Sequence, residues 1–186
     1  MNLEVLQYPD PRLKRKSEPV AAITDEILAL AAQLAETMYE HEGIGLAAPQ
    51  VGRFVRMITI DLSGPDKREA LQVYVNPVLE PLPPLEGDDD YLETEEGCLS
   101  VPDYRSSVKR HTRVRLKALG LDGQPLERDV TDLESICLQH ECDHLDGKLF
   151  IDRISRLKRG LYDGKIKKKL KAEQADQGLL PEQQAE

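Results

Sequence analysis

The sequence contains little cysteine and no long apolar run, and both shortages exclude classes of protein. Its 186 residues include three cysteines, too few for the disulfide framework of a secreted domain, so we expect free thiols, metal ligands or packing residues. No segment approaches the roughly 20 consecutive apolar residues of a membrane-spanning helix. The first 20 residues also lack the apolar block and cleavage site of a secretory signal. We therefore expect a cytoplasmic protein with no membrane partner.

The charged residues are unevenly distributed along the chain. The formal net charge is −9, yet residues 153–171 carry nine Lys and Arg against one acid, Asp163, which makes this segment +8. A solvated helix face is the usual explanation of such a run, and contact with a phosphate backbone is the sharper alternative. Tyr162 is the only aromatic residue there, so we do not expect recognition of nucleic-acid bases.

Helical and strand patterns occur in separate blocks. Thr24 can cap a first helix, and Gly43 can end it as a left-handed residue. The apolar stripe of this helix is Ile27, Leu28, Ala31, Leu34, Ala35 and Met38. Residues 55–62, 71–79 and 114–119 are rich in Val, Ile and Leu and predict strands. An Asp-Gly turn within 120–124 predicts a hairpin to residues 125–130, and the acidic, proline-containing residues 82–93 predict a surface loop.

A second helix has the clearer start signal. Thr131 and Glu134 form a Ser/Thr-x-x-Glu capping box, and Gly147 follows the last periodic residue, which predicts a buried helix over 132–146. A helix, then strands, then a helix favours an α+β fold over an alternating parallel sheet. We expect residues 1–173 to form a compact single domain, including a basic C-terminal helix at about 153–171. The polar residues 174–186 are expected to form a flexible tail, and nothing in the sequence requires more than a monomer.

The second predicted helix carries a His-Glu-x-x-His pattern. At about 100° per residue, His140 and His144 project from one face about a turn apart, so both imidazoles can reach one cation. Glu141 lies beside them, where it can act as a general base and leave the cation to the histidines. Two satisfied core histidines are the alternative. The position of the pattern on a capped helix, between Ile136 and Leu145, favours a metal site.

Each of the three cysteines is a candidate for the third ligand. Cys142 points to the other side of the helix, where we expect it to pack. Cys137 shares the face of His140, but about 10.5 Å of helix separates it from His144, which is too far for both to share one metal. We expect Cys137 to line the pocket wall. Cys98 remains, in a strand-and-turn segment that can bring a thiolate to the helix. Two imidazoles and a thiolate leave one coordination position open, as in catalytic sites.

Three segments coincide in a particular order: GIGLAAPQVG at residues 43–52, EEGCLSVP at 95–102 and QHECDHLDG at 139–147. Together they resemble the signature motifs of bacterial peptide deformylases, and the similarity extends over about residues 3–170. The resemblance implies a hydrolase that removes the N-formyl group from the initiating methionine of nascent polypeptides and releases formate. It also implies a compact α+β domain in which mixed, largely antiparallel sheets pack around the helix that carries the metal ligands.

The resemblance also assigns catalytic roles to residues of the three motifs. The implied metal ligands are Cys98, His140 and His144, and Glu141 is the implied acid/base. Gln50 and the backbone N–H of Leu99 are implied to stabilise the developing oxyanion, which agrees with the chemistry expected of such donors.

Substrate binding is expected to use both main chain and side chains. Ile44 and Gly45 lie at an irregular Gly-rich edge where a peptide can pair as an added strand. The resemblance places further residues around the methionine side chain and its neighbours, namely Ile44, Leu133, Ile136, Cys137 and Arg105. Thr94 departs from the apolar residue expected at its position, which leaves its effect on side-chain preference open.

The metal and the basic segment are interpreted through the family. Thiolate and imidazole ligands suit Fe(II), Zn(II), Co(II) and Ni(II) alike, and the family points to Fe(II) in the cell, with the other ions as substitutes. A C-terminal helix in related bacterial enzymes contacts the ribosome, a role that residues 153–171 suit through phosphate contacts unless residues 161–164 interrupt the helix. A metallo-endopeptidase and a binding protein with a structural metal site are the competing hypotheses.

Overall fold

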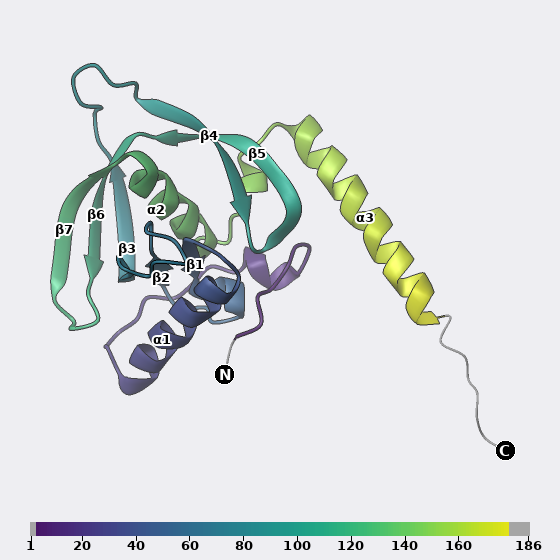
Figure 1. Ribbon diagram of the computed structural model, residues 1–186, viewed down its shortest axis with the longest axis horizontal. Helices are drawn as coiled ribbons and strands as arrows, with labels where there is room; N and C mark the ends of the chain where they lie inside the picture. Colours follow the sequence, from purple (N-terminus) through teal and green to yellow (C-terminus); the bar gives the residue numbers. More distant parts are fainter. Residues whose placement is uncertain (1–2, 179–186) are drawn as a thin grey trace. The chain divides into compact units, whose positions relative to one another are not determined.

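The computed structural model, which describes residues 3–178, divides into a larger unit that ends at Arg153 and a smaller one that begins at Ile154. The larger unit has an α+β fold built on two antiparallel sheets (Figure 1). Five strands form the first sheet in the order β1-β2-β3-β6-β7. Their bounds are β1 Gly45–Ala47, β2 Met57–Ile60, β3 Gln72–Pro81, β6 Arg113–Leu119 and β7 Pro125–Thr131. The second sheet is a hairpin of β4 Tyr91–Cys98 and β5 Val101–His111.

The helix α2 (Asp132–Leu145) is the centre of the larger unit, as the sequence predicts. It contacts strands of both sheets, namely β1, β2, β3, β5, β6 and β7. Figure 1 shows it between the β3–β6–β7 side of the first sheet and the β4–β5 hairpin. Gln139 ties it to the end of β5, because its side-chain amide donates to the His111 carbonyl at 2.8 Å and accepts from the His111 N–H at 3.1 Å. Both sheets therefore meet at the helix that carries the His-Glu-x-x-His pattern.

The start of α2 is where the sequence predicts it, but the predicted capping box is wrong. Thr131 makes no capping hydrogen bond to the helix and donates instead to the Asp132 carboxylate at 2.6 Å. Glu134 forms an ion pair with Arg128, which also contacts Tyr74. A charge-assisted bond to a guanidinium is stronger than a capping bond to a backbone amide, so the carboxylate turns outward. The other end follows the prediction, with Gly147 left-handed at φ 70°.

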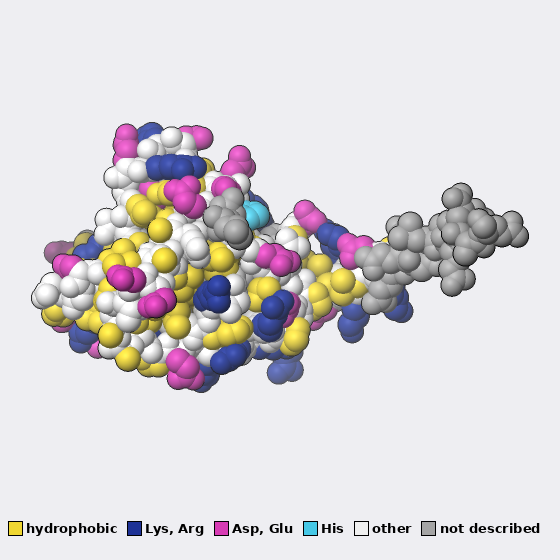
Figure 2. Space-filling model, turned by 90° about the horizontal axis from the view of Figure 1, so that it is seen from below, with side chains coloured by type: hydrophobic (Ala, Val, Ile, Leu, Met, Phe, Trp, Pro, Cys, Tyr) yellow, Lys and Arg dark blue, Asp and Glu magenta, His cyan; other side chains and the backbone are white. Residues whose placement is uncertain are grey.

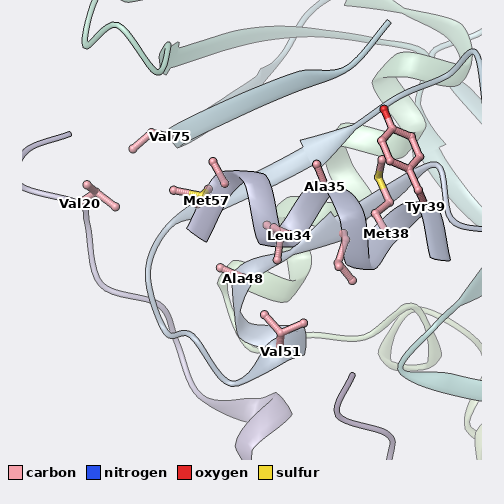
Figure 3. Close-up of a cluster of buried hydrophobic side chains, with 11 residues drawn as sticks. Val20, Leu34, Ala35, Met38, Tyr39, Ala48, Val51, Met57 and Val75 are labelled. Carbon is pink, nitrogen blue, oxygen red and sulfur yellow. The ribbon is translucent and has the colours of Figure 1, made fainter. Parts of the chain in front are cut away.

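Helix α1 (Asp25–Glu40) packs its apolar stripe on the first sheet and the short helix η2 (Ala48–Val51). Figure 3 shows the cluster, which includes Val20, Leu34, Ala35, Met38, Tyr39, Ala48, Val51, Met57 and Val75. Thr24 caps the helix as predicted and accepts from the Ile27 N–H at 3.4 Å. Leu28, predicted within the stripe, lies at its edge and is 41% exposed.

The end of α1 differs from the prediction that Gly43 is left-handed. Glu42 takes that conformation, with φ 55°, and Gly43 is not among the residues of positive φ. A Cβ at Gly43 would lie 3.3 Å from both the Leu99 side chain and the Met38 carbonyl. Glycine is therefore favoured at this position because a larger side chain would crowd the β4–β5 turn, and not because the backbone has a positive φ.

Two predicted connections are observed with small changes. The β6–β7 hairpin pairs Leu119 with Pro125, and its turn contains the left-handed Gly123. The predicted acidic loop is shorter than expected, since β4 already begins at Tyr91 and the connection covers residues 82–90. Two further short helices complete the larger unit, η1 (Pro11–Lys14) and η3 (Phe150–Asp152).

The smaller unit consists, in its described part, of helix α3 (Arg156–Gly178). Residues 161–164 do not interrupt it. Its basic segment contains one acid, and Arg159 contacts this Asp163 at 3.1 Å. Residues 174–178, expected to belong to a flexible tail, are helical, and 179–186 lie outside the described residues. No helix in residues 3–178 has the length and apolar character needed to cross a membrane.

Candidate active site

Three predicted ligands come together where the β4–β5 turn meets α2. Cys98 is the last residue of β4, and His140 and His144 lie one turn apart on α2. The Cys98 Sγ is 3.3 Å from the His144 Nε2, which is 3.3 Å from the His140 Nε2, and the three ligand atoms lie within 4.8 Å of one another. Strand and helix thus supply the thiolate and the imidazoles from segments about forty residues apart in the sequence.

The spacing of these atoms fits a single divalent cation. Ligands held tetrahedrally at about 2.0–2.3 Å from a metal lie roughly 3.3–3.7 Å from each other, close to the two distances of 3.3 Å. His144 is buried, and His140 is 11% exposed at its side chain. Among the His, Cys, Asp and Glu side chains of the described residues, this is the only group of three or more with such spacing. Soft thiolate and borderline imidazole donors suit transition metals rather than calcium or magnesium.

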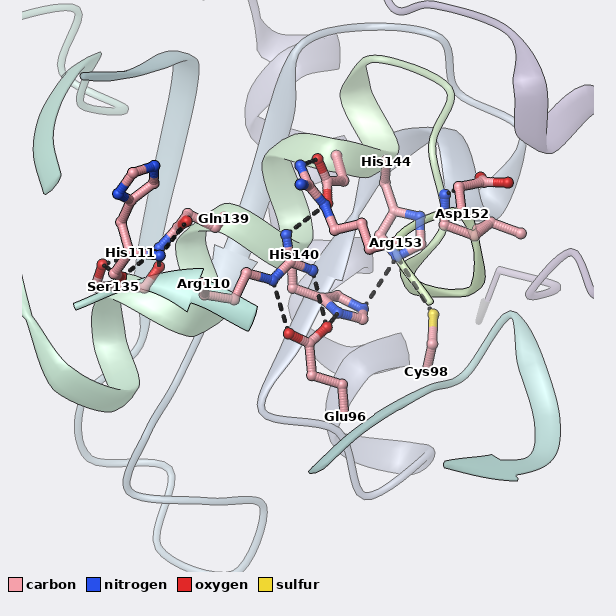
Figure 4. Close-up of polar contacts among 12 residues, drawn as sticks. Glu96, Cys98, Arg110, His111, Ser135, Gln139, His140, His144, Asp152 and Arg153 are labelled. Atoms are coloured by element: carbon pink, nitrogen blue, oxygen red, sulfur yellow. Dashed lines mark hydrogen bonds and ion pairs between the residues drawn. The ribbon is translucent and has the colours of Figure 1, made fainter. Parts of the chain in front are cut away.

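A buried ionic chain holds His140 from behind (Figure 4). Glu96 accepts from or shares a proton with the His140 Nδ1 at 2.8 Å, which leaves the Nε2 facing the other two ligands. Arg110 donates to both Glu96 oxygens, at 2.7 and 2.8 Å, and to the Asp143 carboxylate at 2.6 Å. Arg153 then binds Asp143 through two bonds of 2.5 Å. These bonds tie the His140 imidazole to Glu96 of β4 and, through it, to Arg110 of β5.

The two cations of this buried ionic network, Arg110 and Arg153, balance its two anions, Glu96 and Asp143. Arg110 is 2% exposed and Glu96 is 6% exposed, so neither charge could be buried alone. Burial by itself would raise the pKa of Glu96, but the hydrogen bonds from Arg110 and His140 outweigh it and lower that pKa to about 2. Glu96 is therefore an anion at neutral pH. It can orient an imidazole that also serves as a ligand.

Glu141 has a different environment from Glu96. The residue is 4% exposed, and its Oε2 is one of three buried side-chain polar atoms in the described residues that have no hydrogen-bond partner. Burial raises the pKa of Glu141 to about 7. A carboxyl with this pKa can exchange a proton at neutral pH, as a general acid/base must. The unpartnered oxygen is free to face a reacting molecule.

Gly45 allows Glu141 to take this position. A Cβ at Gly45 would lie 2.9 Å from the Glu141 Cδ and 3.1 Å from the Cys137 Sγ, with the Glu141 Oε1 nearer still. No other residue type leaves room for the carboxylate. The absent side chain of the first-motif glycine thus provides the space that the carboxyl of the third-motif glutamate occupies.

Gln50 points its amide N–H groups toward the thiolate. Its Oε1 accepts from the Ala47 N–H at 2.8 Å, which orients the group, and its Nε2 donates to the Cys98 Sγ at 3.4 Å and to the Ser100 Oγ at 3.1 Å. Leu99 follows Cys98 in the turn and lines the same cavity. Gln50 thus contacts the ligand cluster directly, and Leu99 lines the same cavity.

The predicted substrate-binding residues line one cavity of about 1010 Å³ beside the ligands. They are Ile44, Gly45, Arg105, Leu133, Ile136 and Cys137, which share the cavity with Gln50, Cys98, Leu99, His140 and Glu141. Cys137 faces it from α2, as expected of a wall residue, whereas Cys142 packs against the second core cluster. His144 is not among the residues that line the cavity and lies behind it at 2% exposure.

Three residues of the site, Glu96, Arg110 and Asp143, are not predicted from the sequence. A signal for Glu96 existed, because residues two apart in a strand share a face and Cys98 was already the expected ligand. Arg110 and Asp143 gave no comparable signal, since an arginine in a strand and an aspartate in a helix are usually exposed. Only the fold brings these charges into the interior.

Known proteins resemble this chain over most of its length. The family described as polypeptide deformylase matches residues 2–160. The peptide deformylase of Pseudomonas aeruginosa is 46% identical over 175 residues, which cover 94% of this chain and 98% of that protein. The peptide deformylase 1 of Pseudomonas syringae is 47% identical over 168 residues, or 90% of this chain and 94% of that protein.

Solved structures share the fold. A crystal structure of a peptide deformylase from Legionella pneumophila superposes with a TM-score of 0.79 at 38% identity and covers 97% of this chain and 100% of that one. The structure of a peptide deformylase from Synechococcus elongatus in complex with actinonin has a TM-score of 0.76 at 35% identity, with 88% and 85% covered.

Proposed function

The chain belongs to the polypeptide deformylase family of metal-dependent enzymes that remove the formyl group from nascent peptides, and we propose how its own residues perform this reaction. The metal ligands are Cys98, His140 and His144. Glu141 is the acid/base, and Gln50 and the Leu99 N–H are the oxyanion donors. The observation that carries this assignment is the meeting of one thiol and two imidazoles within 4.8 Å, beside a cavity that Cys98, His140 and Glu141 line.

The donor set supports a transition metal, and we propose Fe(II) in the cell, with Zn(II), Ni(II) or Co(II) as substitutes. When bound, such a cation supplies Lewis acidity, which acidifies water and polarises a carbonyl. Glu96 and the buried Arg110 keep His140 oriented toward the cation through its Nε2. Each outer partner of this kind typically changes metal affinity or activity by about 10- to 100-fold.

Glu141 moves the proton in this mechanism. With a pKa of about 7, it is partly ionised at neutral pH and takes a proton from the attacking water. The Leu99 N–H and the Gln50 Nε2, which exchanges one of its bonds to Cys98 and Ser100, donate to the oxygen of the formyl group as it gains negative charge. Each such donor is typically worth about 3 kcal/mol of barrier. Glu141 then passes its proton to the departing amine. The products are formate and a peptide with a free amino terminus.

Peptide binding uses the edge of the first sheet. β1 is an edge strand, paired with β2 on one side only among the strands described. A peptide can pair with such an edge as an added strand, and Gly45 allows its backbone to approach. Ile44, Leu133 and Ile136 offer apolar surface to the methionine side chain, with Cys137 on the wall and Arg105 at the rim.

The test combines metal content with formate release from formyl-Met-Ala-Ser. Cys98→Ala should lose both metal and activity, while Glu141→Gln should keep the metal and lose about 10²- to 10⁴-fold in kcat/KM. Cys142→Ala is the matched control, since this cysteine packs away from the cavity, and it should keep both. Release of internal peptide fragments instead of formate would favour a metallo-endopeptidase. Bound metal without formate release would favour a structural site.

The basic segment 153–171 supports a ribosome contact. Its net charge of +8 suits a phosphate backbone, although two of its nine cations already pair with carboxylates, Arg153 with Asp143 and Arg159 with Asp163. Figure 2 shows acidic and basic side chains intermingled on the face of the larger unit that it presents, in contrast to the nine cations and one acid of this segment. Truncation after Arg153 should abolish co-sedimentation with ribosomes at low salt. Unchanged co-sedimentation at low and moderate salt would refute the contact.

The assignment also extends to domain limits and cellular setting. We propose that residues 1–173 form the deformylase domain with its basic helix. Because nascent peptides are the substrates of the family, we propose action in the cytoplasm. All the residues of the candidate site come from one chain, so a monomer suffices. Analytical ultracentrifugation of the full chain tests the oligomeric state.

A further inference from the structure

Thr94 is a polar residue on the wall of the substrate cavity. It lies on β4, two residues before Glu96, so both side chains are on the same face of the strand. Glu96 reaches His140 on α2, which shows that this face is turned toward the helix. Thr94 pairs with the buried Val108 of β5 and lines the cavity together with Leu133 and Ile136 of α2.

The hydroxyl of Thr94 is buried and lacks a partner. Its Oγ1 is one of the three buried side-chain polar atoms without a hydrogen bond in the described residues, and another is the Glu141 Oε2 in the same cavity. A buried hydroxyl without a partner is destabilising, and a valine of the same shape would avoid this cost. Thr94 as a whole is partly exposed and lines the cavity, so a change of its χ1 rotamer would turn the hydroxyl toward a bound ligand.

The surroundings limit what that partner can be. The helix side of this wall is apolar, with Leu133 and Ile136. A charged or strongly hydrated group would therefore lose more hydration free energy on entry than one hydrogen bond restores. A thioether combines an apolar chain with an acceptor sulfur that needs no donor of its own. The methionine side chain fits this description. Norleucine has nearly the same shape and has no acceptor.

We propose that Thr94 is a specificity-determining residue whose hydroxyl donates to the sulfur of the substrate's first side chain. This inference rests on the proposed binding of the methionine side chain in the cavity. A thioether is a weak acceptor, so the gain is moderate, about three- to tenfold in kcat/KM for methionine over norleucine.

The test compares formyl-Met-Ala-Ser with formyl-norleucine-Ala-Ser in four proteins: wild type, Thr94→Val, Thr94→Ser and Thr94→Ala. The wild type should prefer the methionine peptide by about three- to tenfold. Thr94→Val has the same shape without the hydroxyl and should bring the ratio close to one, with the loss confined to the methionine peptide. Thr94→Ser should keep the preference and Thr94→Ala should lose it, which separates the hydroxyl from changes in packing.

Each outcome bears on the proposal. A ratio that is the same in wild type and Thr94→Val overturns it, as does a ratio that falls equally in Thr94→Ser and Thr94→Ala. Formate release from both peptides with no dependence on residue 94 would leave the proposed function standing and refute only the role of Thr94. Absence of formate release from either peptide in the metal-loaded wild type would refute the proposed function itself.

Discussion

Replacement of Gly45 by alanine should inactivate the enzyme through Glu141. The added Cβ would lie 2.9 Å from the Glu141 Cδ and 3.1 Å from the Cys137 Sγ, both shorter than an ordinary contact. Gly45 is not among the glycines of positive φ, so the backbone accepts alanine without strain. The glutamate carboxyl is the end of a flexible side chain and has to move by about 1 Å. A misplacement of this size costs about 10²-fold in rate.

The assay measures kcat/KM for formate release, metal content and the free energy of unfolding. We expect Gly45→Ala to lose about 10²-fold in kcat/KM and to retain the metal. Overpacking of this kind lowers the free energy of unfolding by about 1–3 kcal/mol, so the protein should still fold. Activity within threefold of wild type would refute the reasoning.

A double-mutant cycle identifies the cause of the loss. In the Glu141→Gln background, Gly45→Ala should reduce activity further by only a small factor, because the carboxylate that it displaces is already gone. Fully additive losses would show that Gly45 acts elsewhere, for instance through the peptide that pairs with β1. The cycle therefore separates a positioning effect on Glu141 from an effect on substrate pairing.

Two further predictions concern the buried charges. Arg110→Met leaves two buried carboxylates without their shared partner and should lower the free energy of unfolding by about 3–5 kcal/mol in urea denaturation. The control, Arg115→Met, removes an exposed ion pair and should change the free energy of unfolding far less. Equal effects of the two substitutions would contradict this account. Tyr39 donates to the buried Asp61 at 2.7 Å, so Tyr39→Phe should cost about 1.5–3 kcal/mol at pH 7. Burial raises the pKa of Asp61, but hydrogen bonds from Ser63 and Tyr39 outweigh it and lower that pKa. The stabilisation is thus present above the ordinary value of about 3.9 and is lost as pH falls through the folded-state pKa. A difference between variant and wild type that persists unchanged at pH 2–3 would refute this explanation.

Local sequence signals failed where a tertiary contact competed for the same group. The Thr131 and Glu134 pattern predicts a capping box, yet Arg128 on the preceding strand takes the glutamate. Gly43 satisfies the rule for a helix end, but crowding by Leu99 explains its presence better than its dihedral angles do. In both cases the helix boundary was still predicted within a few residues, because the apolar periodicity does not depend on the cap.

The sequence by itself determined the chemistry of the site. The spacing of His140, Glu141 and His144 gives their relation on any α-helix, and the distance from Cys137 to His144 leaves Cys98 as the candidate thiolate. These conclusions follow from helix geometry, which is local and nearly invariant.

Only the tertiary structure decided how the site is supported. The pairing of β4 with β5 and the packing of both against α2 bring Glu96, Arg110 and Asp143 into one buried ionic chain behind His140. The same packing leaves the Thr94 hydroxyl and the Glu141 Oε2 without partners in the cavity. Burial and pairing are properties of segments that are distant in sequence, and burial is what raises the pKa of Glu141 to about 7. The motif predicts Glu141 as the acid/base, and the fold sets the pKa of this residue.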